Sequence, residues 1–260
     1  MSQFPFMDEP EERDLNEVVR RAASSNPLPK RFYERAEAIL EGSEYVLKLD
    51  GRVARTPARN VLQVSNRELA ELIAQEWQSQ GKEINPDTMP FTRIVNSTLD
   101  GVANRPEEVI ADMVRYAGSD LVLYRSDGPA RLVEMQQAAW NPVLEWHQQK
   151  SGASFLLAEG VMHVEQPEVS LNIIRDEVRG FESVLALAAL HVMTTLTGSV
   201  LISLAHARNH LSSEAAWEAA HIDELYQEQV WGIDTEAHTR RKSRERDFLA
   251  ASRIIQSLSV

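Results

Sequence analysis

SVLALAALHVMTTLTGSVLISLA, residues 183–205, is the stretch that decides what kind of protein this chain forms. It contains no Asp, Glu, Lys or Arg, and by length alone it could cross a bilayer. Polar groups and a glycine nevertheless interrupt the run: His191, Thr194, Thr195, Thr197, Gly198, Ser199 and Ser203. This mixture is more typical of buried helices than of a membrane span. We therefore expect two buried helices that meet near Gly198.

Before this stretch, the sequence carries the turn signal of a β-hairpin. Asp50-Gly51 separates the mostly apolar residues 45–49 from residues 52–56, and Asp-Gly is a preferred two-residue hairpin turn. Residues 61–64 are expected to form a third short strand, and residues 121–124 another. These strands indicate a β-containing region in the first half of the chain.

Helical patterns occupy most of the remaining sequence. Ser65-Asn66-Arg67-Glu68 matches a capping box and predicts a helix that continues to about Gln80. Glu76 falls within the apolar arc of this helix, and the pattern gives no partner for it. Further helices are expected over residues 91–102 and 106–118. Beyond Asp127-Gly128-Pro129 the pattern is almost wholly helical, apart from a looser stretch over residues 152–167.

These patterns predict an α+β fold, in which a small amino-terminal β-containing domain is followed by a larger all-helical carboxy-terminal domain. The expected divisions are a flexible leader over residues 1–29, an α/β domain over residues 30–128 and a helical domain over residues 129–260. The leader is polar and ends in Asn-Pro-Leu-Pro, a composition that does not favour a packed structure.

The formal net charge of −12 narrows the classes of partner. A strongly anionic protein repels nucleic acid and anionic lipid, so we expect neither nucleic-acid binding nor membrane insertion. A cationic patch on another protein fits better. The chain has no cysteine, which is compatible with a reducing compartment. Its first residues resemble neither a secretory signal nor a transit peptide, so we expect the bacterial cytoplasm, or the mitochondrial matrix for a processed organellar protein.

Residues 212–231, SSEAAWEAAHIDELYQEQVW, are expected to form one long acidic helix, opened by Ser212 or Ser213 as the N-cap. At 100° per residue, one stripe holds Ala215, Ala219, Ile222, Tyr226 and Val230, and the opposite stripe holds Trp217, His221, Glu224, Glu228 and Trp231. Since a helix needs only one apolar face to pack, two tryptophans on the second stripe suggest a surface for another protein; packing within the chain is the alternative. The basic run RRKSRER, residues 240–246, is expected to be a solvated helix face.

The sequence offers little that resembles an active site. It has no phosphate-binding G-x-x-x-x-G-K-[ST], no G-x-G-x-x-G and no G-x-S-x-G. His206 and His210 are one helical turn apart, but Ala207 occupies the place where a zincin carries its glutamate. The alternative function left open is a metal-dependent hydrolase using this histidine pair. We expect no cofactor, no metal and no catalytic activity, and hence a binding protein.

The motifs of this chain resemble those of the assembly chaperones of the F-type ATP synthase catalytic sector, specifically the members that hold the α subunit before it pairs with β. The resemblance spans roughly residues 30–245. Its segments are KRFYERAEA, LDGRVARTPARN, ELAELIAQEWQSQGKEINPDTMPFTRIVNSTLD, SDLVLYR, VEMQQAAWNPVLEW, LTGSVLISLA and AWEAAHIDELYQEQVWGIDTEAH. No single segment is specific, but their combination is.

The resemblance implies a non-enzymatic chaperone that covers the α-subunit surface destined for β. It also implies a functionally critical acidic residue in the carboxy-terminal helical region, where this chain offers Asp223, Glu224, Asp234 and Glu236. Glu236 is favoured first and Glu224 next. Trp231 and Glu228, from the stripe described above, complete the expected partner-binding set. A structural subunit that stays in the finished complex is a further alternative.

Overall fold

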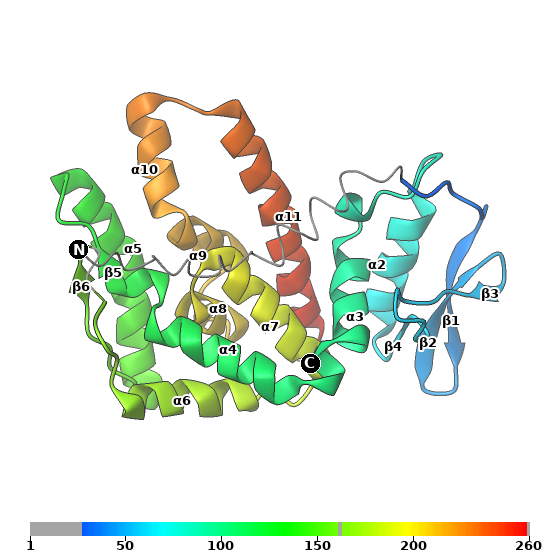
Figure 1. Cartoon of the computed structure of the whole chain (residues 1–260), viewed down its shortest axis with the longest axis horizontal. Coiled ribbons are helices and arrows are strands. Elements are labelled where there is room, and N and C mark those ends of the chain that lie inside the picture. The colour runs from blue at the N-terminus through cyan, green and yellow to red at the C-terminus, as the bar shows by residue number, and fades with distance from the viewer. Residues whose placement is uncertain (1–27, 161–162, 259–260) are drawn as a thin grey trace, which may run out of the picture.

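A small sheet and a larger body of helices lie at opposite ends of the molecule (Figure 1). The structure is a computed structural model and describes residues 28–160 and 163–258, so the expected leader falls almost wholly outside the described residues. The predicted α+β class is confirmed, with the sheet in the first part of the chain and the helical body after it. The carboxy-terminal helix α11 (Thr235–Leu258) crosses the helical body toward the sheet end.

The sheet contains the predicted hairpin and one strand that the sequence did not reveal. Strand β2 (Glu44–Leu49) turns through Asp50 (φ 47°) and Gly51 (φ 77°) into β3 (Arg52–Val53), as expected for an Asp-Gly turn. Strand β1 (Ala36–Glu41) pairs antiparallel with β2, and β4 (Gln63–Val64) pairs with the start of β2. Strand β1 was missed because AEAILE mixes alanine and glutamate, which are depleted in strands.

Helix α2 (Arg67–Gln78) carries the buried carboxylate of Glu76, for which no partner could be assigned from the sequence pattern. Asn66 is its N-cap, with the side-chain oxygen accepting from the Leu69 amide. On its buried face, Glu76 accepts hydrogen bonds from the backbone amides of Phe91 and Thr92, both at 2.8 Å, and from the Thr92 hydroxyl. Glu76 therefore caps the start of α3 (Pro90–Asp100), where amide groups lack helical partners.

The next elements connect the sheet region to the helical body. Helix α4 (Pro106–Gly118) packs against α6 (Glu168–Arg179) and α7 (Val184–Thr197), although it precedes the expected domain boundary near residue 128, which stays a prediction. The strand expected over residues 121–124 is mostly wrong: Leu121–Leu123 form a 3-10 turn, opened by the Asp120 side chain that accepts from the Val122 amide. Only Tyr124–Arg125 form a strand, β5, which pairs in parallel with β6 (Ala158–Glu159).

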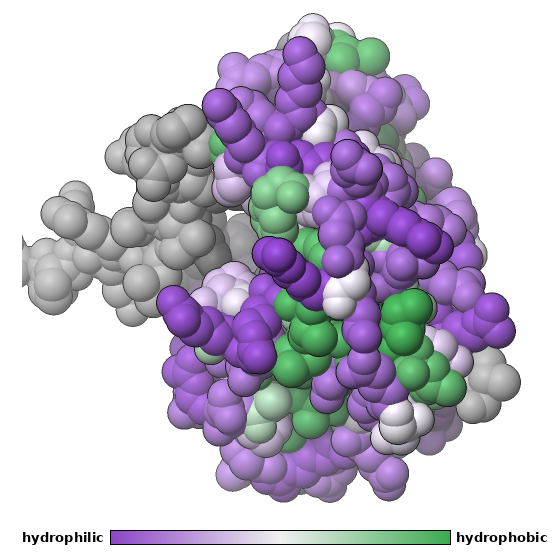
Figure 2. Space-filling view, turned by 90° about the vertical axis from the view of Figure 1, so that its right-hand side faces the viewer, coloured by the Kyte–Doolittle hydropathy of each residue, from purple (hydrophilic) through white to green (hydrophobic). Residues whose placement is uncertain are grey.

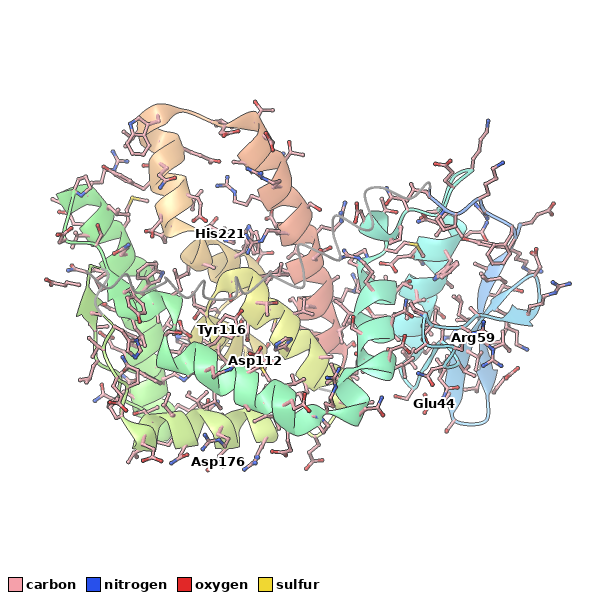
Figure 3. The ribbon with its side chains drawn as sticks, viewed as in Figure 1. Glu44, Arg59, Asp112, Tyr116, Asp176 and His221 are labelled. Atoms are coloured by element: carbon pink, nitrogen blue, oxygen red, sulfur yellow. The ribbon has the colours of Figure 1, made fainter. Side chains whose placement is uncertain are left out.

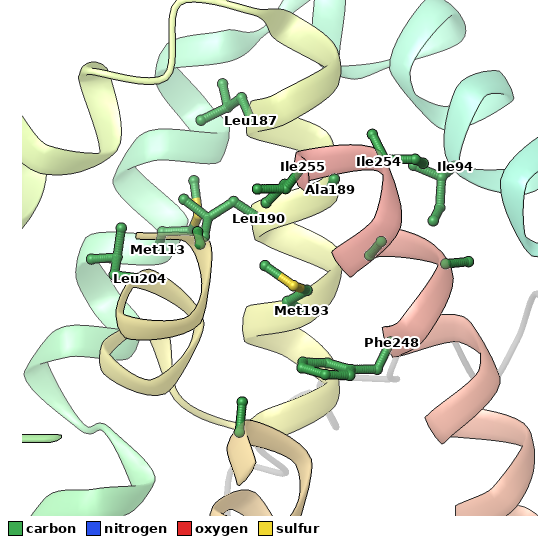
Figure 4. Close-up of a cluster of buried hydrophobic side chains, with 14 of the residues drawn as sticks. Ile94, Met113, Leu187, Ala189, Leu190, Met193, Leu204, Phe248, Ile254 and Ile255 are labelled. Carbon is green, nitrogen blue, oxygen red and sulfur yellow. The ribbon is translucent and has the colours of Figure 1, made fainter. Parts of the chain in front are cut away.

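The apolar run at residues 183–205 forms two buried helices, as predicted. Helix α7 ends at Gly198, whose φ of +70° suits glycine, and Ser199 then caps α8 (Val200–Ala207). Figure 4 shows Leu190 and Met193 of α7 packed with Phe248 and Ile255 of α11. Within the described part of the chain, no helix is long and apolar enough to cross a membrane.

Helix α5 (Ala130–Ser151) packs against α8 and α9, and buried hydrogen bonds from α5 and from Asp120 hold these helices in place. The indole Nε1 of Trp140 donates to the Ala219 carbonyl at 2.7 Å. The fully buried His147 donates through Nε2 to the Leu201 carbonyl at 3.0 Å. Asp120, also fully buried, accepts from the Leu201 amide at 3.1 Å. The start of α8 is thus bonded on both sides, which fixes the centre of the helical body.

Candidate functional site

The expected long acidic helix is two helices with a break at His221. Helix α9 (Ser213–Ala220) is capped by Ser212, as predicted, and helix α10 (Ile222–Trp231) leaves it in a new direction (Figure 1). At the break His221 has φ −125° and ψ 26°, outside the helical region. Because the two helices do not share one axis, a stripe projected along the whole segment does not describe either of them.

The break corrects half of the predicted recognition surface. Trp217 is only 6% exposed and His221 only 4%, whereas the sequence placed both on a face available to a partner. The Trp217 ring lies 3.9 Å from the His221 ring and 5.3 Å from Phe248 of α11, measured between centroids. Trp217 belongs to the core because α9 packs against both α8 and α11. The alternative of packing within the chain is therefore right for α9.

Helix α10 has the opposite character. None of its ten residues, all of which the structure describes, is buried. It packs on one side against α5, and its end carries Trp231, 77% exposed, beside the exposed Val230. Gly232 then turns the chain at φ +86°, and Ile233, 65% exposed, follows. We call Val230, Trp231 and Ile233 the apolar tip. Three exposed apolar side chains at one turn are typical of a protein-binding surface.

The apolar tip differs from the apolar side chains exposed at the sheet end. Figure 2 shows that end of the molecule with hydrophobic areas interrupted by hydrophilic side chains. The exposed apolar residues there come from separate segments, namely Phe32, Ile39, Leu40 and Val53. The apolar tip instead occupies four consecutive residues at the turn between α10 and α11, so its side chains can reach one partner together.

Below the tip, a cleft opens between α10 and α11, with a volume of about 650 Å³. A second hollow of about 350 Å³ continues it downward to Trp140 and Gly198. His221 and Glu224 line both hollows, and Figure 3 shows His221 where α9 meets α10, at the base of the space beside α11. The cleft and the tip together form the candidate site.

Three of the six expected partner-binding residues make bonds that hold the walls of this cleft. Asp223 accepts from the Gln136 amide of α5 at 2.7 Å. Glu228 pairs with Arg241 of α11 at 2.8 Å, and this hydrogen bond is the main reason that its pKa is lowered. Asp234 accepts from the amides of Glu236 and Ala237 and so caps α11.

The other three expected residues face solvent. Trp231 belongs to the apolar tip. Glu236 is highly exposed and makes an ion pair with Arg240, one turn along α11, at 3.2 Å. Glu224 is exposed and, among the residues that the structure describes, has no hydrogen bond or ion pair. The available anionic groups at the site are therefore Glu224 inside the cleft and Glu236 beside the tip.

The basic run at residues 240–246 is bonded into the structure more than a solvated face would be. Arg241 forms the bond to Glu228 described above. Arg244 donates to the Leu196 carbonyl of α7 at 2.7 Å, and Arg246 donates to the Asp87 carbonyl at 2.5 Å. The expectation of a solvated face is wrong for Arg241 and Arg244, which are half-buried because α11 passes beside α10 and α7, whereas Arg246 stays exposed. The three bonds fix α11, the second wall of the cleft.

The histidine pair considered for a hydrolase is used for packing. His206 is buried, with Nδ1 donating to the Leu211 carbonyl and Nε2 bonded to the Ser252 hydroxyl at 2.7 Å. The His210 ring stacks on Trp146. Within residues 28–160 and 163–258, no three His, Cys, Asp or Glu side chains are grouped to hold a metal ion. Both ring nitrogens of His206 are therefore engaged within the protein, which does not fit a metal ligand.

Sequence reasoning missed the anchors of α10 and the position of His221. Gln136 and Arg131 of α5 bond to Asp223 and Gln229, and neither residue stands out in the sequence. His221 was expected on an open face, whereas it is buried at the base of the cleft. A helical projection contains no signal for these positions, because they follow from how α10 lies on α5.

Comparisons with known proteins give a consistent result. The family model described as ATP12 chaperone protein matches residues 30–148. Protein atp12, mitochondrial, from Schizosaccharomyces pombe is 25% identical over 248 residues, 89% of this chain and 85% of that protein. The crystal structure of Atp12 from Paracoccus denitrificans is 34% identical with a TM-score of 0.79, over 88% of this chain and 98% of that chain. The structure of a candidate chaperone from Agrobacterium tumefaciens is 39% identical with a TM-score of 0.84, over 95% and 93%.

Proposed function

Because this chain belongs to the ATP12 chaperone family, we propose that it is an assembly chaperone that binds the unassembled α subunit of F1-ATPase. It covers the surface through which that subunit later pairs with β, and it makes and breaks no covalent bond. The bacterial cytoplasm is the proposed compartment; the relative from S. pombe is mitochondrial.

The observation that carries the proposal is the apolar tip. Trp231, Val230 and Ile233 project from an arm whose helix has no buried residue, so the arm adds little to the core. Tryptophan is enriched among the residues that dominate binding energy at protein interfaces. An arm of this kind suits the transient covering of an apolar surface on a client.

We assign two roles to the six acidic and aromatic residues of the site. Trp231, Glu236 and Glu224 contact the α subunit, because their side chains are exposed. The other three carboxylates position these side chains. Asp223 joins α10 to α5, Glu228 joins α10 to α11, and Asp234 caps α11. Glu236 remains the first choice for a critical charge, because it is exposed close to the apolar tip. Reversing it disturbs a surface ion pair, which contributes little to stability.

The mechanism is mass action. The chaperone lowers the concentration of free α subunit and so reduces encounters between its exposed interfaces. Pairing with β displaces the chaperone if the β interface is the larger one. The net charge of −12 attracts a cationic surface over long range and raises the rate of encounter more than the affinity.

Co-expression with the isolated α subunit tests the function. The soluble fraction of the α subunit is measured with and without this protein, and complexes are isolated through a tag on the chaperone. We expect the α subunit to become soluble and to co-purify with it, and the β subunit expressed alone not to do so. Equal solubility of the α subunit in both cultures, without co-purification, would contradict the proposal.

A further inference from the structure

His221 presents an unused hydrogen-bond acceptor to the base of the cleft. Its Nδ1–H donates to the Trp217 carbonyl at 2.8 Å, so the lone pair of the neutral ring is on Nε2. Among the described residues Nε2 has no hydrogen-bond partner, although the side chain is 4% exposed and lines both hollows. Nε2 is not among the fully buried side-chain atoms that lack a partner, so it opens to the hollows that His221 lines, where a ligand can supply a donor to it.

Glu224 supplies a negative charge at the same place. It lies three residues after His221, lines the same two hollows, and is close enough for its carboxylate to raise the pKa of the ring. Burial has the largest effect and lowers the pKa of His221, and the charges of Arg244 and Arg241 lower it further, which keeps the ring neutral. The base of the cleft therefore combines an anionic acceptor with a neutral one.

The carboxylates that line the cleft outnumber its arginines. Its walls carry five carboxylates and three arginines. Arg241 is paired with Glu228, Arg240 with Glu236 outside the cleft, and Arg244 donates to the Leu196 carbonyl. The cleft thus has a net negative charge. Arg244 keeps its positive charge beside the base, because its partner is a neutral carbonyl, and it lines both hollows together with Glu224.

We infer that the base of the α10–α11 cleft binds the guanidinium group of an arginine on the client protein, through Glu224 and Nε2 of His221. This assignment rests on the proposed function, because it places the arginine on the surface that the chaperone covers. A guanidinium has five N–H donors in one plane, so one group can bond to a carboxylate and an imidazole at the same time. The apolar tip then contacts the client above the arginine.

A small probe tests the site without the client. N-acetyl-arginine methylamide is titrated into the full-length protein, and N-acetyl-citrulline methylamide, with a neutral urea of the same shape, into a second sample. Binding is followed by the ¹⁵N shift of His221 Nε2 in NMR spectra. We expect the arginine probe to move this signal and to bind at least tenfold more tightly than the citrulline probe.

Two matched variants locate the charge that is responsible. Glu224→Gln removes one negative charge from the cleft, and Glu145→Gln removes one from the exposed face of α5. We expect Glu224→Gln to weaken arginine binding at least tenfold and Glu145→Gln to leave it within twofold. Equal binding of both probes, or equal loss in both variants, would overturn the assignment.

The same variants separate this inference from the proposed function. If the parent protein captures the α subunit and Glu224→Gln captures it equally well, the guanidinium site is wrong while the chaperone function stands. If the parent does not capture the α subunit but binds the arginine probe through Glu224, the proposed client is wrong and the guanidinium site stands. Loss of capture in Glu224→Gln, with an unchanged melting temperature, supports both.

Discussion

Helices α8 and α10 are similar in length and opposite in environment. Every residue of α8 is buried, and its start is bonded to His147 and Asp120. No residue of α10, a helix described in full, is buried, and its carboxylates are either exposed or bonded to neighbouring helices. We therefore expect α8 to contribute mainly to stability, and α10 is the helix to which we have assigned client recognition. Substitutions in the two helices should therefore affect different measurements.

The largest effect is expected from Leu201→Ala in α8. Leu201 is fully buried, and removing its side chain leaves a cavity that should lower the free energy of unfolding by about 3–4 kcal/mol. Urea denaturation followed by circular dichroism measures this change. The same measurement on Trp231→Ala should give a change below about 0.5 kcal/mol. If Leu201→Ala and Trp231→Ala lowered the free energy of unfolding by similar amounts, α10 would contribute to stability as much as α8 does.

A pH series tests the polar bonds around α8. Burial lowers the pKa of His147 to about 4, so its contribution to stability is present above 6.5, its unperturbed value, and is lost as the pH falls through 4. The full loss is up to about 3 kcal/mol for a shift of this size. Burial raises the pKa of Asp120 to about 6, and its contribution has the opposite sign: it is present below 3.8 and lost as the pH rises through 6.

The pH dependence due to Asp120 is present in both the parent and the His147→Gln variant. It therefore cancels in the difference between their free energies of unfolding. The free energy of unfolding is measured by urea denaturation between pH 7.5 and 4. We expect the parent to lose more stability than the variant as the pH falls. Parallel curves for the two proteins would show that His147 does not cause the loss.

In α10, Trp231→Ala should act on binding alone. Loss of a central tryptophan is expected to lower the affinity for the α subunit about 30-fold, or about 2 kcal/mol. Isothermal titration calorimetry measures the affinity. The control is Val169→Ala on α6, which removes a side chain of similar exposure, 72%, far from the apolar tip. An equal loss in the control would argue against a specific role for the tip.

The smallest of these effects is expected from Glu236→Lys. Glu236 is exposed, and within residues 28–160 and 163–258 its ion pair is with Arg240 alone, so the melting temperature should change little. Reversal of the charge should lower the affinity for the α subunit about tenfold, because a cationic client surface would then be repelled. A pull-down at several salt concentrations checks this result. If Glu236→Lys captured the α subunit at low salt as well as the parent does, Glu236 would not be the critical acidic residue.

The sequence predicted the elements that local patterns determine. Gly198 placed the junction of α7 and α8, and Asp50-Gly51 placed the β2–β3 turn, because glycine accepts positive φ at both positions. The break at His221 could not be predicted, since neither glycine nor proline is present there and the bend results from packing α9 on α11 and α10 on α5. Trp231 was placed correctly and Trp217 was not, because the two residues lie on opposite sides of that bend.

Helix α11 connects the apolar tip to the sheet region. It starts beside the apolar tip and, at 1.5 Å per residue, extends roughly 36 Å. Its far end meets α2 and α3 through Arg253–Glu68, Asp247–Arg93 and the bond from Asn66 to the Ser257 carbonyl. Midway along its length, Arg244 also bonds the helix to the Leu196 carbonyl of α7. A client held at the apolar tip would therefore contact an element that both the helical body and the sheet region hold in place, which limits how far the tip can move when it binds.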